Sequence, residues 1–194
     1  MNNIKFKEIL AGEHITLKIP TANFETAHML FRVVSRNREH LGKWLPWVAK
    51  NTQPEHSYDF LQSIVKGFNE NAKAEYFIYE KSTSDFCGIC SAHTHFSTTH
   101  KYISLGYWLD KEKCGKGYMT EAVKLIEDDL FEQNATRLII QNDIENMGSV
   151  NVPKRLGYHL EGIARADFYS EYLNSYRDIY TWSKLHPDIE KQRG

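Results

Sequence analysis

Two glycines, Gly115 and Gly117, stand in a short segment that joins a run of strand character to a run of helical character. Glycine has no Cβ, so the backbone can turn tightly there and approach a ligand closely. The first N–H groups of the following helix have no partner within the helix and lie at the positive end of its dipole. This arrangement suits a phosphate or pyrophosphate group, with Lys116 as an additional positive charge. The dipole alone contributes only about 0.3–1 kcal/mol, so directed backbone hydrogen bonds must supply most of the affinity.

This glycine turn does not by itself identify a ligand. It lacks the GxxxxGK[ST] order of a P-loop, and Thr120 stands where a third glycine would complete the dinucleotide-binding fingerprint. An ordinary glycine turn is therefore the alternative on this feature alone.

The segment 87–90, Cys-Gly-Ile-Cys, is followed by His93 and His95 and has the composition of a metal cluster. Residues three apart in a strand point to opposite faces. Cys87 and Cys90 therefore cannot converge without a turn at Gly88, and we expect no metal site here.

Periodic hydrophobic patterns predict a mixed order of helices and strands, with an antiparallel meander in the middle of the chain. Thr52 and Glu55, three residues apart, are typical of a capping box at the start of the second helix. Pro153 cannot lie inside a helix without losing a hydrogen bond, so we expect it near the start of the last, short helix. The expected elements are a strand at 14–18, helices at 24–34 and 54–68, strands at 75–81, 86–96 and 102–109, a helix at 119–130, a strand at 137–141, a short helix at 149–156 and two last strands, the first at 158–163.

The composition is that of one ordinary globular domain. The chain has 194 residues, 24 Lys and Arg against 25 Asp and Glu, and 41% hydrophobic residues. Neither a linker nor a repeat divides it, so residues 1–194 are expected to form a single domain. The balanced charge argues against generic binding to nucleic acid or to an anionic membrane. No apolar run approaches the roughly 18 residues of a membrane span and the start lacks a signal-peptide core, so we expect a cytoplasmic protein.

Three cysteines are too few, and odd in number, for a secreted disulfide framework, so reduced thiols are expected. Cys114 stands next to a helix N-terminus, where a lowered pKa would make it reactive and allow it to be acylated first. A plain loop thiol is the alternative.

Several motifs, in order, resemble those of the GNAT acetyltransferase superfamily and, within it, the ribosomal-protein N-acetyltransferases of the RimJ and RimL type. The superfamily's acetyl-CoA loop, Gln/Arg-x-x-Gly-x-Gly/Ala, maps to Cys114, Gly117 and Met119, and this chain departs from it at Cys114 and Met119. The resemblance covers nearly the whole chain. The matching motifs are Leu-Gly-Lys-Trp-Leu at 41–45, Gly-Tyr-Trp at 106–108, Gly-Lys-Gly-x-x-Thr-Glu-Ala at 115–122, Asn-x-x-Ser at 146–149, Leu-Gly-Tyr at 156–158 and Glu-Gly at 161–162.

The resemblance implies one α/β domain of the α+β type, with a mixed, mostly antiparallel sheet that is flanked by helices and splayed where the cofactor enters. It also implies direct transfer of acetyl from acetyl-CoA to a primary amine in a ternary complex, without a metal. Backbone N–H groups of the loop would bind the pyrophosphate, and the strand before it would pair with the pantetheine arm and polarise the thioester oxygen. The residues implied to contact acetyl-CoA are Tyr107, Trp108, Leu109, Cys114, Gly115, Lys116, Gly117, Tyr118, Met119, Thr120, Asn146 and Ser149.

The resemblance further implies the groups that move protons. Ser149 would lie near the sulfur and protonate the leaving thiolate, although a helix N-cap is an alternative role for it. A carboxylate in the loop before the last strand would take the proton of the amine, and this loop contains Asp167 and Glu171. Glu171 is our first choice because it precedes a Tyr-Leu-Asn sequence similar to the family's. A solvated loop carboxylate is the alternative.

The acceptor is less well indicated. An α-amine, with a pKa of about 7.7–8.0, costs roughly 3.5 kcal/mol less to deprotonate than a lysine, which favours a protein N-terminus of the ribosomal-protein type. Trp44 and Trp47 flank Pro46 and could wall the acceptor groove, or belong to the core. A small amine such as an aminoglycoside or polyamine, and a CoA-binding regulatory module without turnover, are the alternatives. Related proteins are often dimers, so the resemblance allows a homodimer.

Overall fold

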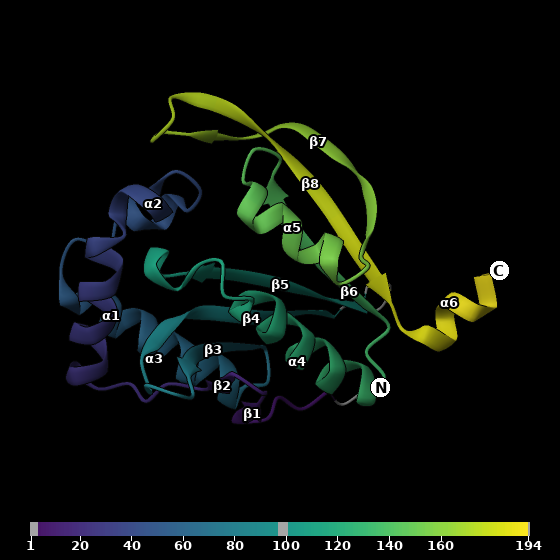
Figure 1. Ribbon diagram of the computed structural model, residues 1–194, viewed down its shortest axis with the longest axis horizontal. Helices are drawn as coiled ribbons and strands as arrows, with labels where there is room; N and C mark the ends of the chain where they lie inside the picture. The colour runs from purple at the N-terminus through teal and green to yellow at the C-terminus, as the bar shows by residue number, and fades with distance from the viewer. Residues whose placement is uncertain (1–3, 97–100, 194) are drawn as a thin grey trace.

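The computed structural model describes residues 4–96 and 101–193 and has one eight-stranded, mostly antiparallel sheet in the order β1-β2-β3-β4-β5-β6-β8-β7 (Figure 1). This confirms the expected α/β fold with a mixed sheet. The strands are β1 (Ile9–Ala11), β2 (Ile15–Lys18), β3 (Lys73–Glu80), β4 (Phe86–Phe96), β5 (Lys101–Leu109), β6 (Arg137–Asp143), β7 (His159–Ser170) and β8 (Ser175–Leu185). The helices are α1 (Phe24–Arg36), α2 (Arg38–Gly42), α3 (Pro54–Asn69), α4 (Tyr118–Glu132), α5 (Met147–Arg155) and α6 (Pro187–Arg193), with short 3-10 turns η1 (Pro46–Ala49) and η2 (Lys111–Lys113).

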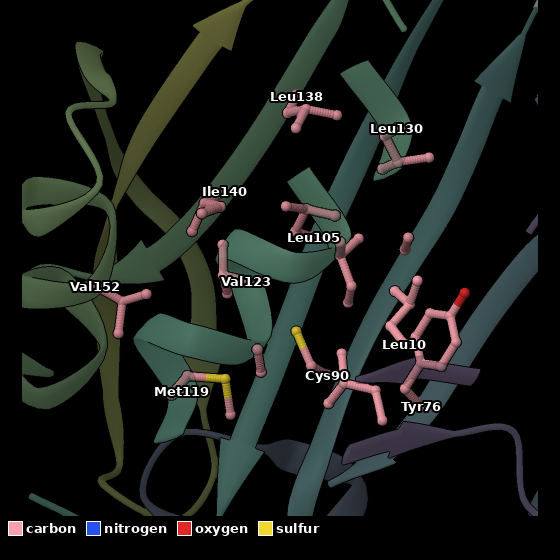
Figure 2. Close-up of a cluster of buried hydrophobic side chains, with 14 of the residues drawn as sticks. Leu10, Tyr76, Cys90, Leu105, Met119, Val123, Leu130, Leu138, Ile140 and Val152 are labelled. Atoms are coloured by element: carbon pink, nitrogen blue, oxygen red, sulfur yellow. The ribbon is translucent and has the colours of Figure 1, made fainter. Parts of the chain in front are cut away.

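Two hydrophobic cores lie on opposite faces of the sheet. On one face, α4 and α5 pack on β3 to β6, and Figure 2 shows Met119 and Val123 of α4 among Cys90, Leu105 and Ile140 of the strands. On the other face, α1 and α3 pack on the alternate residues of β3 and β4. Since successive side chains of a strand point to opposite faces, β3 and β4 contribute to both cores. No helix in residues 4–96 or 101–193 combines the length and hydrophobicity needed to span a membrane.

The sheet splays between β5 and β6. These two strands run parallel and pair only over Ile103–Leu138, Ser104–Ile139 and Leu105–Ile140. β5 then continues beside β4 as far as Leu109, while β6 follows β8 to Asp143. From Gly106 onward, β5 therefore has no strand on its β6 side within the part of the sheet that the structure describes, and the gap lies next to the N-termini of α4 and α5.

Helix α3 differs from the prediction in how its N-terminus is capped. It begins at Pro54 with Gln53 as N-cap, and no side chain caps it. The capping box predicted from Thr52 and Glu55 is therefore wrong. The N–H of Thr52, which lies before the N-cap, instead donates to Nδ1 of His56 at 3.3 Å.

A β-bulge at Gly88 makes the expected orientation of Cys87 and Cys90 wrong. The β3–β4 register shifts between Ile78 and Tyr79, and this shift brings both Cys87 and Cys90 into the same core. Gly88 has φ +153°, and a Cβ on it would lie 2.2 Å from the carbonyl oxygen of Trp108. Glycine is required there because β4 must approach β5 closely. Among the residues with a described placement, no group of three or more His, Cys, Asp or Glu side chains has metal-site geometry.

Candidate active site

A cavity of about 830 Å³ lies at the splayed edge of β5, between the N-termini of α4 and α5. All the residues implied to contact acetyl-CoA line it, and so does Trp44. Sequence reasoning missed a further group, the β1–β2 turn from Gly12 to His14 and His40 of α2, which also line this cavity. The expected residues that it brings together are Tyr107, Trp108, Leu109, Cys114, Gly115, Lys116, Gly117, Tyr118, Met119, Thr120, Asn146 and Ser149.

The glycine loop presents a row of backbone donors. Gly115 has φ +80° and Gly117, the N-cap of α4, has φ +84°, both in the left-handed region. Within the described residues, no hydrogen bond occupies the N–H groups from Gly115 through Thr120. A Cβ at either glycine would meet nothing within 4 Å, so the space beside these N–H groups is open. Consecutive free N–H groups at the positive end of a helix form an anion-binding site.

The start of this loop is held by α1. The carboxylate of Asp110 is buried and accepts from Arg36 and from Asn37 Nδ2, the latter at 3.0 Å. The Oδ1 atom of Asn37 in turn accepts from the N–H of Lys111 at 2.9 Å. Burial opposes ionisation of Asp110, but the hydrogen bonds from Arg36 and Asn37 hold its pKa below the usual value. The loop therefore leaves β5 from a fixed anchor.

The far part of the loop is tied to the end of β3. Glu80 accepts from Lys113 Nζ at 2.7 Å and from the hydroxyl of Tyr118, and Lys116 Nζ lies 3.6 Å away. These hydrogen bonds, that of Lys113 first, lower the pKa of Glu80 to about 2. One carboxylate thus holds Lys113 and Tyr118, which bracket the two glycines, and lies close to Lys116 between them.

Substitution Glu80→Gln is expected to lower the melting temperature at pH 7. Because the folded-state pKa of Glu80 is depressed, its stabilisation is present above its unfolded pKa and is lost as the pH falls from about 4.5 toward about 2. Thermal unfolding of both forms from pH 7 to pH 2.5 should therefore show the difference narrowing on acidification. The control Glu70→Gln removes an exposed carboxylate 3.9 Å from Lys66 and should change the curve little. A difference that does not depend on pH would contradict the assignment.

Glu121, part of the Thr-Glu-Ala motif, fastens the β1–β2 turn to α4. Its Oε1 accepts from the N–H groups of His14 at 2.9 Å and of Ile15 at 3.4 Å. A Cβ on Gly12 would lie only 2.1 Å from the same oxygen. The turn is thereby held at the rim of the cavity, which no local pattern in the sequence could indicate.

The two positions that depart from the family loop have different environments. Met119 is 6% exposed and its side chain packs in the core (Figure 2). Cys114 is exposed, and its Sγ contacts the carbonyl of Asp110 at 3.4 Å. Partial burial, with the charge of Asp110 as a smaller cause, raises the pKa of the Cys114 thiol. The lowered pKa considered for Cys114 is therefore wrong, which argues against an acyl-cysteine mechanism and for a plain loop thiol.

Ser149 is placed by the first turn of α5. The N-cap is Asn146, whose Oδ1 accepts from the N–H of Ser149 at 3.3 Å, so the N-cap role considered for Ser149 is wrong. Pro153 lies well inside this helix rather than near its start, which corrects the expectation for it. A proline at 153 cannot donate to the carbonyl of Ser149, and the hydroxyl of Tyr107 donates to that carbonyl instead at 3.0 Å. The strand β5 thus supplies the hydrogen bond that the proline removes.

Substitution Tyr107→Phe is expected to destabilise the protein by about 1–3 kcal/mol, because the partly buried carbonyl of Ser149 loses its donor. It should also lower kcat, since Ser149 is no longer fixed against β5. In a Pro153→Ala background the loss of stability should be smaller, because the new N–H can donate to the same carbonyl. A double-mutant cycle measured by denaturant unfolding tests this, and additive effects of the two substitutions would contradict it.

A second cavity, of about 810 Å³, lies on the face covered by α1 and α3. Trp47 lines this cavity, so the structure separates it from Trp44, with which it was expected to wall one groove. Leu45, Tyr107 and Trp108 line both cavities, which therefore meet across β5.

The two expected bases lie elsewhere. Asp167 belongs to β7, which extends to Ser170 instead of ending near residue 163, and Glu171 lies in the turn between β7 and β8. Both are exposed, and neither lines either cavity. The hairpin tip reaches toward α2 in Figure 1, and a Cβ on Gly42 would lie 3.2 Å from the ring of Tyr172. The role of Glu171 or Asp167 as base stays a prediction.

Comparison with known proteins agrees with this geometry. Residues 16–159 match the family described as the acetyltransferase (GNAT) domain. The Bacillus subtilis protein YdaF is 28% identical over 188 residues, which are 94% of this chain and 97% of that protein. The structure of a ribosomal-protein-S5-alanine acetyltransferase from Vibrio fischeri superposes with a TM-score of 0.83 at 26% identity, covering 94% of this chain and 98% of that chain. The ribosomal L7/L12 α-N-protein acetyltransferase RimL, in complex with coenzyme A, has a TM-score of 0.81 at 21% identity over 92% of this chain and 98% of that chain.

The matched residues span well over half of the chain and include the glycine loop. The chain therefore belongs to the GNAT acetyltransferase family. The likeness to RimL, at 21% identity, shows a common fold. The YdaF protein and the Vibrio fischeri structure match this chain over nearly its whole length.

Proposed function

We propose that this protein transfers the acetyl group of acetyl-CoA to a protein N-terminal α-amine, of the ribosomal-protein type. The observation that carries the proposal is the row of free N–H groups from Gly115 through Thr120, which lies beside the splayed edge of β5 in one cavity. The Vibrio fischeri relative is named for a ribosomal-protein alanine, and RimL for the α-amine of L7/L12, which supports a protein N-terminus as acceptor.

Each part of the cavity would perform one task. The free N–H groups of the loop would bind the pyrophosphate of acetyl-CoA, with Lys116 as an additional charge. The unpaired edge of β5 from Gly106 to Leu109 would hydrogen-bond the pantetheine arm and polarise the thioester carbonyl. Asn146 would contact the arm, and Ser149 would protonate the departing thiolate. No resident metal or prosthetic group is needed for this transfer.

Acetylation of a small amine, such as an aminoglycoside or polyamine, is the alternative acceptor chemistry. A CoA-binding module without turnover is the alternative outside the enzyme class. A cytoplasmic location and a homodimer are parts of the proposal that rest on the kind of relative and not on the geometry.

Calorimetric titration with acetyl-CoA, with ATP and NADH as controls, tests the cofactor. Thiol release is then measured with peptides that begin with alanine or serine, the same peptides blocked at the N-terminus, spermidine and an aminoglycoside. We expect binding of acetyl-CoA alone and turnover of the unblocked peptides. Turnover of the small amines alone would replace the acceptor, binding without any turnover would indicate the regulatory module, and no binding would overturn the proposal.

A further inference from the structure

The second cavity contains ionisable side chains to which the proposed cofactor site assigns no role. Glu75 of β3 lines it and is only 7% exposed. Its Oε1 accepts from Lys73 Nζ at 2.9 Å and lies 3.6 Å from Nε2 of His93 on β4. Within the described residues, the second oxygen, Oε2, accepts no hydrogen bond. A buried carboxylate with one free oxygen, lining a cavity, can bind a cationic donor.

The strand register aligns this carboxylate with the splay of the sheet. Glu75 lies opposite Ser91, and Ser91 lies opposite Gly106, so the three residues form one row across β3, β4 and β5. Neighbouring strands are about 4.8 Å apart, which places the row's two ends about 10 Å apart at the Cα atoms. Gly106 is the first residue of β5 beyond its last pair with β6. The row therefore ends where the edge of β5 becomes free.

The residues at the β5 end of this row are small. Gly106 has no side chain, and the hydroxyl of Ser91 donates to the carbonyl of Gly106 at 3.1 Å. Leu45, Tyr107 and Trp108 line both cavities. A thioester held along the free edge of β5 would therefore be reached from the second cavity, past Gly106.

We propose that the second cavity binds the acceptor as its protonated amine, with Glu75 as the ammonium partner and proton acceptor and His93 as the group that passes the proton to solvent. This inference rests on the proposed function and adds the acceptor site to it. It assigns the first proton transfer to Glu75 instead of Glu171.

The ammonium group gives one proton to the Glu75 carboxylate, and the neutral amine attacks the thioester carbon. The C–N bond forms, the C–S bond breaks, and the second amine proton ends on the CoA sulfur by way of Ser149. Glu75 returns to the carboxylate by giving its proton to Nε2 of His93, which releases it to water.

The surroundings fit these roles. The side chain of His93 is 41% exposed, so its ring connects the buried carboxylate with solvent. Burial lowers the pKa of His93, with Lys73 and His95 adding to the effect and Glu75 opposing it, which favours the neutral ring and the release of a proton to water. The other charged or titratable residues that line the cavity are Lys50, His56, Asp59 and Tyr107.

Steady-state kinetics with an alanine-initiated peptide and acetyl-CoA test the inference. We expect Glu75→Gln to lower kcat/KM for the peptide by about 10²-fold or more, with an unchanged Kd for acetyl-CoA. His93→Gln should lower kcat less and remove an inflection from its pH profile. The control Glu70→Gln also removes a carboxylate that lies near a lysine, Lys66. Glu70 lines neither cavity, so this variant should leave the kinetics unchanged.

Two results would overturn the inference: wild-type kinetics in Glu75→Gln, or a loss confined to Glu171→Gln. Should circular dichroism show that Glu75→Gln does not fold, Ser91→Val provides a second test. The larger valine side chain would occupy space between Glu75 and Gly106, so it should raise the KM for the peptide without changing the Kd for acetyl-CoA. If the wild type acetylates no amine, the proposed function fails. Titration of the unblocked and the blocked peptide into the acetyl-CoA complex then tests the acceptor site independently of turnover. Equal binding of the two peptides would reject this site.

Discussion

The variant Gly117→Ala is expected to raise the Kd for acetyl-CoA by about fivefold to thirtyfold. An L-residue in the left-handed region costs roughly 1–2 kcal/mol, and each 1.4 kcal/mol is a factor of ten in affinity when the bound loop must keep that conformation. The added methyl group would also occupy the open space beside the free N–H groups. Isothermal titration calorimetry measures the change.

Gly157 provides a matched control for this prediction. It also has a positive φ, +72°, with nothing within 4 Å of an added Cβ, but it follows α5 and does not line the cavity. Gly157→Ala should therefore lower stability by a similar amount and leave the Kd for acetyl-CoA unchanged. Equal losses of affinity in both variants would mean that the loop conformation has no special role in binding.

The variant Arg177→Met is expected to cost about 3–5 kcal/mol of the free energy of unfolding, because it leaves a buried carboxylate without its partner. Arg177 of β8 is 8% exposed and donates to both oxygens of Asp143, at 2.7 and 2.9 Å, and its guanidinium lies 2.7 Å from Glu145. Asp143 in turn accepts from the N–H of Glu145 at 2.8 Å, just before the N-cap Asn146. The loss should lower the melting temperature by about 6–20 °C.

The matched control is Arg137→Met. Arg137 pairs with Glu161 at 3.1 Å, but their side chains are 33% and 39% exposed. Water screens such a pair, so the expected cost is below about 1 kcal/mol. Denaturant unfolding of both variants measures the contrast, and similar costs would show that burial does not determine the strength of the Arg177 pair.

The parts of the fold that follow a local periodicity were predictable. Alternation of apolar residues located β5, and a run of strand character located β4. Spacing of three and four located α1, α3 and α4, because one face of each helix is buried. β7 was predicted too short because most of its residues are exposed, so it has no apolar alternation to detect. Residues 165–167 fall within a register shift at which Ala166 has φ +52°, and the strand continues beyond this irregularity.

Some residues of the candidate site were also predictable from the sequence, and others were not. The glycine loop could be recognised because its residues are contiguous and only glycine adopts its conformation readily. The anchors of that loop could not, because Asp110 is 74 residues from Arg36 and Lys113 is 33 residues from Glu80. The same holds for Glu75, whose position beside the splay depends on the register of three strands. Pro153 was misplaced because its missing hydrogen bond is compensated by Tyr107, a residue of a distant strand.

The splay also has a consequence for cooperativity. The strands β1 to β5 and the strands β6 to β8 form two subsheets joined through only three residue pairs, from Ile103–Leu138 to Leu105–Ile140. A ligand arm that pairs with the free edge of β5 lengthens this short seam and acts as a substitute strand. Amide exchange at the seam should therefore be slower in the acetyl-CoA complex than in the free protein.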